Sequence, residues 1–177
     1  MASGNQRIPS PNTAENCIVV QRQLAEKDYP VFDFQSDALE NAIPFFDGDC
    51  IIRVANNFVL REKAYRFIHK IYHRLGYNSQ NDTSIRFSIF DAMPETTTLI
   101  AEDKKGEIAG VLTLVFDSPV GIPADGIYRP HIESMRNDGA YLCELISFGT
   151  ADGTRGSVKN IAGLFFCAYL LALSLIH

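Results

Sequence analysis

The chain has 177 residues, 46% of them hydrophobic and 21% charged, and its formal net charge at pH 7 is −5. This length suits one domain, and the composition excludes wholesale disorder, a collagen-like repeat and a disulfide-dense mini-protein. The excess of acidic over basic residues argues against a general nucleic-acid binder, because such a protein needs a net basic footprint.

The N-terminal part of the chain has no clear pattern. We expect residues 1–48 to be a flexible, peripheral segment and residues 49–177 to form the core of the domain. Met1–Ala14 is small and polar and lacks the apolar stretch of a secretory signal. A short helix over Ile18–Lys27, ended by Pro30, fits the stretch that follows.

A strand and an amphipathic helix are predicted next. Cys50–Ala55 is short, apolar and partly β-branched, which is typical of a strand. Asn56 or Asn57 can cap the following helix, and Gly76 suits the position just beyond its last turn. The apolar residues of this helix recur at spacings of three and four and define its buried face: Leu60, Ala64, Phe67, Ile68, Ile71 and Leu75.

Strands, a loop and two helices are predicted in the rest of the chain. In chain order we expect a hairpin of strands Thr96–Glu102 and Glu107–Phe116, a shaped loop at Asp117–Asp125, a short helix at His131–Arg136, a strand at Ala140–Phe148, a glycine-containing turn at Gly149–Gly156 and a final helix capped by Ser157.

The final helix contains an almost unbroken apolar run, Ile161–Ile176. As a helix its 16 residues span about 24 Å, less than a hydrocarbon core of about 30 Å. This favours a helix of the protein core, and a short membrane anchor is the alternative.

Glu144 lies inside the apolar strand predicted at Ala140–Phe148. A buried carboxylate is costly unless it is paired or used, and burial raises its pKa toward the range of a general base. The alternative is an ordinary exposed glutamate. Alternation along the strand puts Glu144 on one face with Leu142, Ile146 and Phe148, and Ser147 on the opposite face.

The glycine turn before the final helix is a candidate phosphate site. A helix N-terminus offers unpaired N–H groups and a partial positive charge. Gly156 lets the backbone approach a ligand, Ser157 caps the helix, and Arg155 and Lys159 add positive charge. An ordinary capped turn is the alternative.

No metal site is expected. His69 and His73 are spaced four apart, but the glutamate of the H-E-x-x-H zinc motif is missing between them. The four cysteines are scattered without a C-x-x-C pair, which predicts reduced thiols in a cytoplasmic protein.

Four stretches of the sequence have a specific wording: Asp91–Thr98 (DAMPETTT), Gly110–Ser118 (GVLTLVFDS), Gly121–Asp125 (GIPAD) and Cys143–Ser147 (CELIS). The predicted order of elements resembles the first part of the GNAT acyltransferase fold. The four stretches are closer still to the N-acyl amino acid synthases, which are related to the acyl-homoserine lactone (autoinducer) synthases. This similarity covers about residues 50–170.

This resemblance implies an α+β fold with a mixed, mostly antiparallel sheet flanked by helices. The closing C-terminal strands of the fold are expected to be missing, which leaves the strand at 141–148 as an unpaired edge.

The resemblance also implies a reaction, namely transfer of a long-chain fatty acyl group from acyl carrier protein to the amine of an amino acid. Ser147 and Phe148 then lie along the phosphopantetheine arm. Arg155, Gly156, Ser157 and Lys159 meet its phosphate. The loop at 117–125 helps to shape an acyl pocket, and Glu144 removes a proton from the amine through water. No tightly bound cofactor, nucleic acid or membrane is implied.

Two departures from related patterns refine this expectation. Enzymes of this fold that use acetyl-CoA carry the pattern Arg/Gln-x-x-Gly-x-Gly/Ala at the loop that binds the pyrophosphate. Arg155–Val158 keeps only part of this pattern. This favours a carrier-protein donor, which has one phosphodiester where CoA has a pyrophosphate. Autoinducer synthases carry Glu-x-Ser-Arg-Phe, whereas Glu144–Phe148 has its serine one residue later. Autoinducer synthesis is therefore a weaker alternative than N-acyl amino acid synthesis. A second alternative is an inactive remnant of an acyltransferase that still binds an acyl or pantetheine group.

Overall fold

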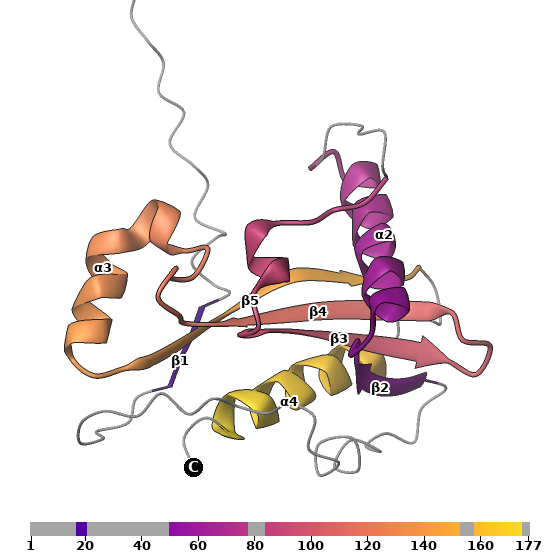
Figure 1. The fold of residues 1–177 in the computed structure, drawn as a ribbon. Helices are drawn as coiled ribbons and strands as arrows, with labels where there is room; N and C mark the ends of the chain where they lie inside the picture. The colour runs from indigo at the N-terminus through magenta and orange to yellow at the C-terminus, as the bar shows by residue number, and fades with distance from the viewer. Residues whose placement is uncertain (1–16, 21–49, 78–83, 153–157, 175–177) are drawn as a thin grey trace, which may run out of the picture.

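The computed structural model describes residues 17–20, 50–77, 84–152 and 158–174. They form one antiparallel sheet with strand order β1-β5-β4-β3-β2. Helix α4 covers one face of the sheet, and α2 and α3 lie on the other (Figure 1). The elements in chain order are β1 (Cys17–Val20), β2 (Cys50–Val54), α2 (Phe58–Arg74), the 3₁₀ helix η2 (Ile89–Ala92), β3 (Thr96–Asp103), β4 (Ile108–Phe116), α3 (Asp125–Asn137), β5 (Tyr141–Thr150) and α4 (Val158–Ser174). The expected α+β class is confirmed.

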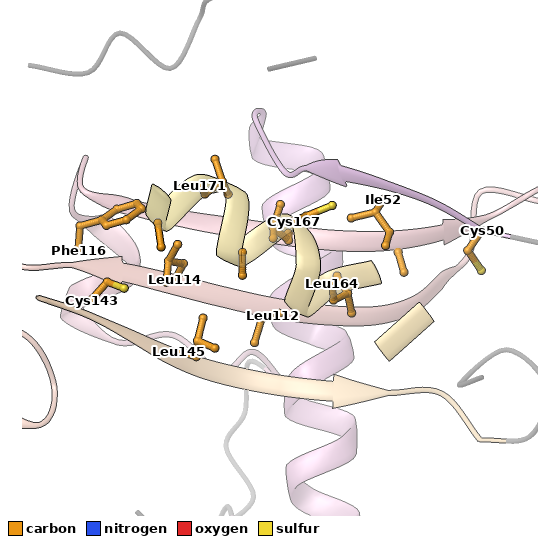
Figure 2. Close-up of a cluster of buried hydrophobic side chains, with 14 of the residues drawn as sticks. Cys50, Ile52, Leu112, Leu114, Phe116, Cys143, Leu145, Leu164, Cys167 and Leu171 are labelled. Atoms are coloured by element: carbon orange, nitrogen blue, oxygen red, sulfur yellow. The ribbon is translucent and has the colours of Figure 1, made fainter. Parts of the chain in front are cut away.

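The main core lies between α4 and the sheet. Figure 2 shows Leu164, Cys167 and Leu171 of α4 lying over Leu112 and Leu114 of β4, and all five side chains are buried. Each fully buried leucine contributes about 1.5–3 kcal/mol. In the part of the chain that the structure describes, no helix is long and apolar enough to cross a membrane.

A glycine of β4 lies directly against α4. A Cβ atom at Gly110 would lie 2.9 Å from Leu164 Cδ1, which is closer than real Cβ atoms approach. The absence of a side chain therefore lets α4 approach the strand at this point.

Helix α2 is the amphipathic helix predicted from its spacing. Asn57 is its N-cap, and its side-chain Oδ1 accepts a hydrogen bond from Leu60 N at 3.0 Å. Gly76 follows the helix with φ of 76°, a conformation that favours glycine. The buried residues Ala64 and Ile68 face the sheet, where they pack with residues of β3 and β4.

Helix α3 begins six residues before the helix predicted at His131–Arg136. Tyr128 leaves the helical conformation, with φ of −117° and ψ of 24°, so Pro130 lies in the first turn of a second helical segment. A proline there costs no helical hydrogen bond. The predicted helix corresponds to this second segment. The first segment was not predicted, because a proline within a sequence normally indicates the end of a helix.

The N-terminal strand corrects two expectations. The helix expected at Ile18–Lys27 is wrong for Ile18–Val20, which belong to strand β1 (Cys17–Val20); the rest of the expected helix lies outside the described residues. β-Branched Ile18, Val19 and Val20 favour a strand. Strand β1 pairs with the first half of β5, from Cys17 opposite Glu144 to Val20 opposite Tyr141. That half of β5 is therefore not an unpaired edge.

Candidate active site

Glu144 lies inside the sheet, one strand from its edge, because β5 runs between the edge strand β1 and β4. Its Cα is opposite Cys17 on one side and Val115 on the other. The predicted alternation is confirmed for Leu142 and Ile146, which pack under α3 in the same cluster as Val115. Glu144 shares this face and is half-buried.

One carboxylate oxygen of Glu144 is fixed by the backbone. Ala124 N, at the end of the loop between β4 and α3, donates a hydrogen bond to Glu144 Oε2 at 2.7 Å. Burial raises the pKa of Glu144 above its usual value, the negative charge of Asp125 adds to this, and the Ala124 N–H group opposes it. The result is an oriented carboxylate with an elevated proton affinity.

Arg136 of α3 holds the loop that carries Ala124. Its Nε and Nη2 atoms donate to the two carboxylate oxygens of Asp117 at 2.6 and 2.7 Å. Its Nη1 and Nη2 atoms donate to those of Asp125 at 2.7 and 2.5 Å. Asp125 Oδ2 also accepts from Ile122 N at 2.8 Å. The guanidinium therefore joins both ends of the loop and lowers the pKa of Asp125.

A β-bulge interrupts β5 three residues beyond Glu144. Thr113 of β4 is opposite Ile146, and Val111 is opposite Gly149, so Ser147 and Phe148 together face a single residue. Ser147 has φ of 51°, in the left-handed region. Such a bulge leaves a residue outside the hydrogen-bond ladder and bends the strand. The regular pairing of β5 with β4 is thus interrupted just beyond Glu144.

The bulge also corrects the predicted orientation of Phe148. The extra residue reverses the alternation, and Phe148 packs with the core under α4 instead of beside Glu144. Its ring centroid lies 5.3 Å from that of Phe165 of α4. Strict alternation fails here because it assumes a regular strand.

Substitutions at Ser147 test the bulge. Ser147→Val should lower the free energy of unfolding by about 1–2 kcal/mol, because a β-branched residue resists a positive φ. Ser147→Gly should be tolerated. At Ser134, exposed on α3, the order should reverse, since glycine is the poorer helix former. Urea unfolding of the four variants measures this, and the same ranking at both positions would contradict the bulge.

Tyr72 of α2 reaches the bulge from the opposite layer. Its phenol is hydrogen bonded to the backbone of Phe148, and burial raises its pKa above the usual 10.0, so the phenol stays protonated at neutral pH. Arg86 stacks over the Tyr72 ring, with Cζ 4.7 Å from the centroid. Helix α2 therefore places a phenol against the backbone of the bulge, and Arg86, from the segment before η2, stacks on this phenol.

An open pocket of about 530 Å³ is lined in part by the loop whose Ala124 binds Glu144. Its apolar lining comes from η2 and the loop, and α3 adds one acidic and one basic side chain. The lining residues are Phe90, Val120, Ile122, Pro123, Asp125, Gly126 and Arg129. Pro123 and Asp125 flank Ala124, so the pocket begins one residue from the group that binds Glu144.

The predicted phosphate turn is only partly described. Arg155, Gly156 and Ser157 lie outside the described residues, and their role stays a prediction. Lys159 lies exposed in the first turn of α4. Among the described residues, no group of three or more His, Cys, Asp and Glu side chains is arranged to hold a metal ion.

Three residues of this site were not identified from the sequence. Arg136 was counted only as part of a short helix, and Ala124 and Tyr72 were not singled out. The Arg136 network could have been predicted, because Asp117 and Asp125 flank the loop and an arginine follows on the next helix. Nothing in the sequence indicates the backbone donor at Ala124 or the contact of Tyr72 with Phe148.

The antiparallel sheet, the helices on both of its faces and the bulged strand β5 define a GNAT-like fold. A protein-family model described as "N-acyl amino acid synthase FeeM" matches residues 63–177, and the chain belongs to this family. A search of curated proteins finds no match.

A solved structure in the same family is similar to this chain. It is "The structure of FeeM, an N-acyl amino acid synthase from uncultured soil microbes", with 25% sequence identity and a TM-score of 0.59. The match covers 71% of this chain and 65% of that chain, so the present chain spans less than two thirds of its relative.

Proposed function

We propose that this chain transfers a long-chain fatty acyl group from the phosphopantetheine thioester of acyl carrier protein to the amine of an amino acid. The observation that carries this proposal is the half-buried Glu144, whose pKa is raised and whose Oε2 is bound by Ala124 N. Family membership supports the reaction class. The carrier donor and amino-acid acceptor follow from the resemblance described above.

Glu144 acts as the general base in this proposal. An amine attacks a thioester only when it is neutral, and an amino acid is an ammonium ion at neutral pH. Because Ala124 binds Oε2, Oε1 is the oxygen that accepts the proton, through water. The amine then forms an N–C bond to the acyl carbon, the C–S bond breaks, and the thiolate takes up a proton to leave as the carrier thiol.

The bulge is the proposed site of the thioester. Ser147 lies about 10 Å along the strand from Glu144, at about 3.3 Å per residue. A tetrahedral intermediate carries an oxyanion that needs hydrogen-bond donors. The backbone of Phe148 already binds Tyr72, so the N–H group of Ser147 is the proposed donor in the bulge. No covalent enzyme intermediate is required.

The open pocket is the proposed site of the acyl chain. Its apolar side, formed by Phe90, Val120, Ile122 and Pro123, suits a hydrocarbon chain. The pocket belongs to the loop expected to shape an acyl site, and it lies beside the Glu144 anchor.

Substitution of Val120 tests the acyl pocket. Val120 is 56% exposed and lines the pocket, so Val120→Trp should fill space without disturbing the core. The preferred acyl chain should become shorter, with kcat/KM for the longest donor falling about tenfold relative to a short one. Val59→Trp, at an exposed position of α2, should leave the preference unchanged. Equal length profiles for both variants would exclude this pocket as the acyl site.

Mass spectrometry tests the reaction itself. The folded chain is incubated with long-chain acyl carrier protein and a mixture of amino acids. A new N-acyl amino acid that is absent without the protein supports the proposal, and its mass identifies acceptor and chain length. Donor binding without product favours the alternative of a remnant that holds an acyl or pantetheine group.

A further inference from the structure

One exposed arginine lines the open pocket together with apolar residues. Arg129 of α3 borders the same space as Phe90, Val120 and Ile122, and its side chain is 71% exposed. A guanidinium binds a carboxylate through two parallel hydrogen bonds. The combination of an apolar wall and a guanidinium therefore suits a ligand in which a hydrocarbon part is joined to a carboxylate.

Arg129 is held much less firmly than Arg136, the other arginine of α3. The Arg136 guanidinium donates hydrogen bonds to the carboxylates of both Asp117 and Asp125. Arg129 Nε, in contrast, lies 3.8 Å from Glu133 Oε1, which is too far for a hydrogen bond, and both side chains are exposed. Surface pairs of this kind contribute little to stability. The Arg129 guanidinium can therefore turn to a ligand at small cost.

Arg129 lies near the loop that orients Glu144. Hydrogen bonding with Arg136 is the main cause of the lowered pKa of Asp125, and the positive charge of Arg129 lowers it further. The Arg129 guanidinium is thus within electrostatic range of Asp125. Asp125 directly follows Ala124, whose N–H group binds Glu144 Oε2. The cation and the proposed general base therefore lie close to the same short segment.

The chemistry of the acceptor requires a cation close to the reacting amine. The carboxylate of an amino acid is two bonds away from its amine nitrogen, so the two groups occupy the site together. Once the amine has lost its proton, the carboxylate is the remaining charge of the acceptor, and the ionised Glu144 repels it. A carboxylate in a partly apolar site is costly without a partner. The acyl thioester is uncharged at its carbonyl and has no need of a cation there.

We propose that Arg129 binds the carboxylate of the amino-acid acceptor and thereby selects amino acids over amines that lack this group. The inference rests on the proposed function, which supplies the acceptor. The same contact persists in the N-acyl amino acid product, whose hydrocarbon chain lies along the apolar wall of the pocket. Arg129 is a specificity-determining residue in this assignment, because it contacts the substrate and takes no part in the transfer of the proton.

Competition between charged and uncharged acceptors tests the role of Arg129. A mixture of the common amino acids competes with a mixture of their α-carboxamides for long-chain acyl carrier protein, and mass spectrometry measures the products. The carboxamides keep the amine and the side chain and lack the negative charge. Because every protein meets the same mixture, the intrinsic difference in reactivity between the two kinds of amine cancels when proteins are compared.

Arg129→Gln should lower the preference for amino acids over carboxamides about 10- to 100-fold, the range expected for a lost hydrogen bond to a charged group. The KM for the amino acid should rise while kcat changes little. Arg129→Lys keeps the charge and should retain part of the preference. Arg66→Gln is the matched control, because Arg66 is also exposed and pairs with a glutamate four residues away. Equal preferences in Arg129→Gln and Arg66→Gln would overturn the proposal.

Binding without turnover separates this inference from the proposed function. N-dodecanoylglycine and N-dodecanoylglycinamide, which differ only in the carboxylate, are titrated onto each protein and followed by calorimetry. The unaltered chain should bind the acid at least tenfold more tightly than the amide, and Arg129→Gln should bind both equally. This result supports the role of Arg129 even if no acyl group is transferred, in which case the proposed reaction fails. Equal affinities in the unaltered chain, or no binding of either compound, overturn the assignment of Arg129.

Discussion

Glu144→Gln is expected to lower kcat for acyl transfer by about 10²- to 10⁴-fold, the range typical of a lost general base, and to leave the KM for the acyl donor almost unchanged. The glutamine oxygen can still accept the hydrogen bond from Ala124 N, so the geometry survives and only the proton acceptor is lost. Steady-state kinetics with the donor held saturating measure the effect. Unchanged turnover would remove Glu144 from the mechanism.

The pH profile gives a second readout for this variant. Because burial raises the pKa of Glu144, the rate of the unaltered chain should fall on acidification at a pH above the usual carboxylate range. Glu144→Gln should lose this acidic limb. Glu133→Gln, on the exposed side of α3, is the control and should keep both rate and profile.

Stability should change in the opposite direction to activity. Because the pKa of Glu144 is raised in the folded state, the free energy of unfolding falls as the pH rises from the unfolded pKa through the folded one and Glu144 ionises. The neutral glutamine avoids this cost at pH 7, so the variant should be no less stable than the unaltered chain. A large loss of stability would instead indicate a structural role for the charge.

Local elements could be predicted because their signals are local. The cap at Asn57, the three-and-four spacing of α2 and Gly76 act within a few residues, and the structure confirms them. Leu75 is the exception, because it lies just beyond the helix as its C-cap and is 54% exposed. The hairpin of β3 and β4 follows from two apolar runs joined by a short turn. Such patterns depend on backbone preferences that do not need the rest of the fold.

Features that depend on distant partners could not be predicted. The sequence of β5 shows alternation, and nothing in it indicates that Ser147 adopts a positive φ to match the register with β4. The pairing of Cys17–Val20 with β5 joins segments more than a hundred residues apart. Glu144 was found because a carboxylate in an apolar strand is unusual, but its anchor at Ala124 is a backbone group that any residue carries.

The Arg136 network shows why the position of Glu144 depends on residues away from it. Asp117 directly follows β4 and Asp125 begins α3, and one guanidinium binds both. Ala124 directly precedes Asp125, so the loop that Arg136 holds is the loop that orients Glu144. The position of Glu144 thus depends on an ion-pair network outside β5, one member of which, Asp125, also lines the pocket.

Arg136→Met is expected to lower the free energy of unfolding by about 2 kcal/mol and to reduce kcat as well. Methionine keeps the apolar stem but leaves Asp117 and Asp125 close together without their shared cation, and their side chains are only 20% and 12% exposed. Arg129→Met is the matched control on the same helix. Its partner Glu133 lies 3.8 Å away on the surface, so its loss should cost less than about 0.5 kcal/mol.

The pH dependence of stability identifies the cause of this loss. Arg136 lowers the pKa of Asp125, so the ionised carboxylate stabilises the folded chain above its unfolded pKa, and this contribution disappears as the pH falls below about 4. The difference in unfolding free energy between the unaltered chain and Arg136→Met should therefore shrink on acidification. Adding Asp117→Asn and Asp125→Asn to Arg136→Met should restore part of the stability at pH 7, because no uncompensated charge remains. A difference that stays constant with pH would assign the loss to packing of the arginine stem, and Glu144 would then be positioned by the shape of the loop and not by its charge.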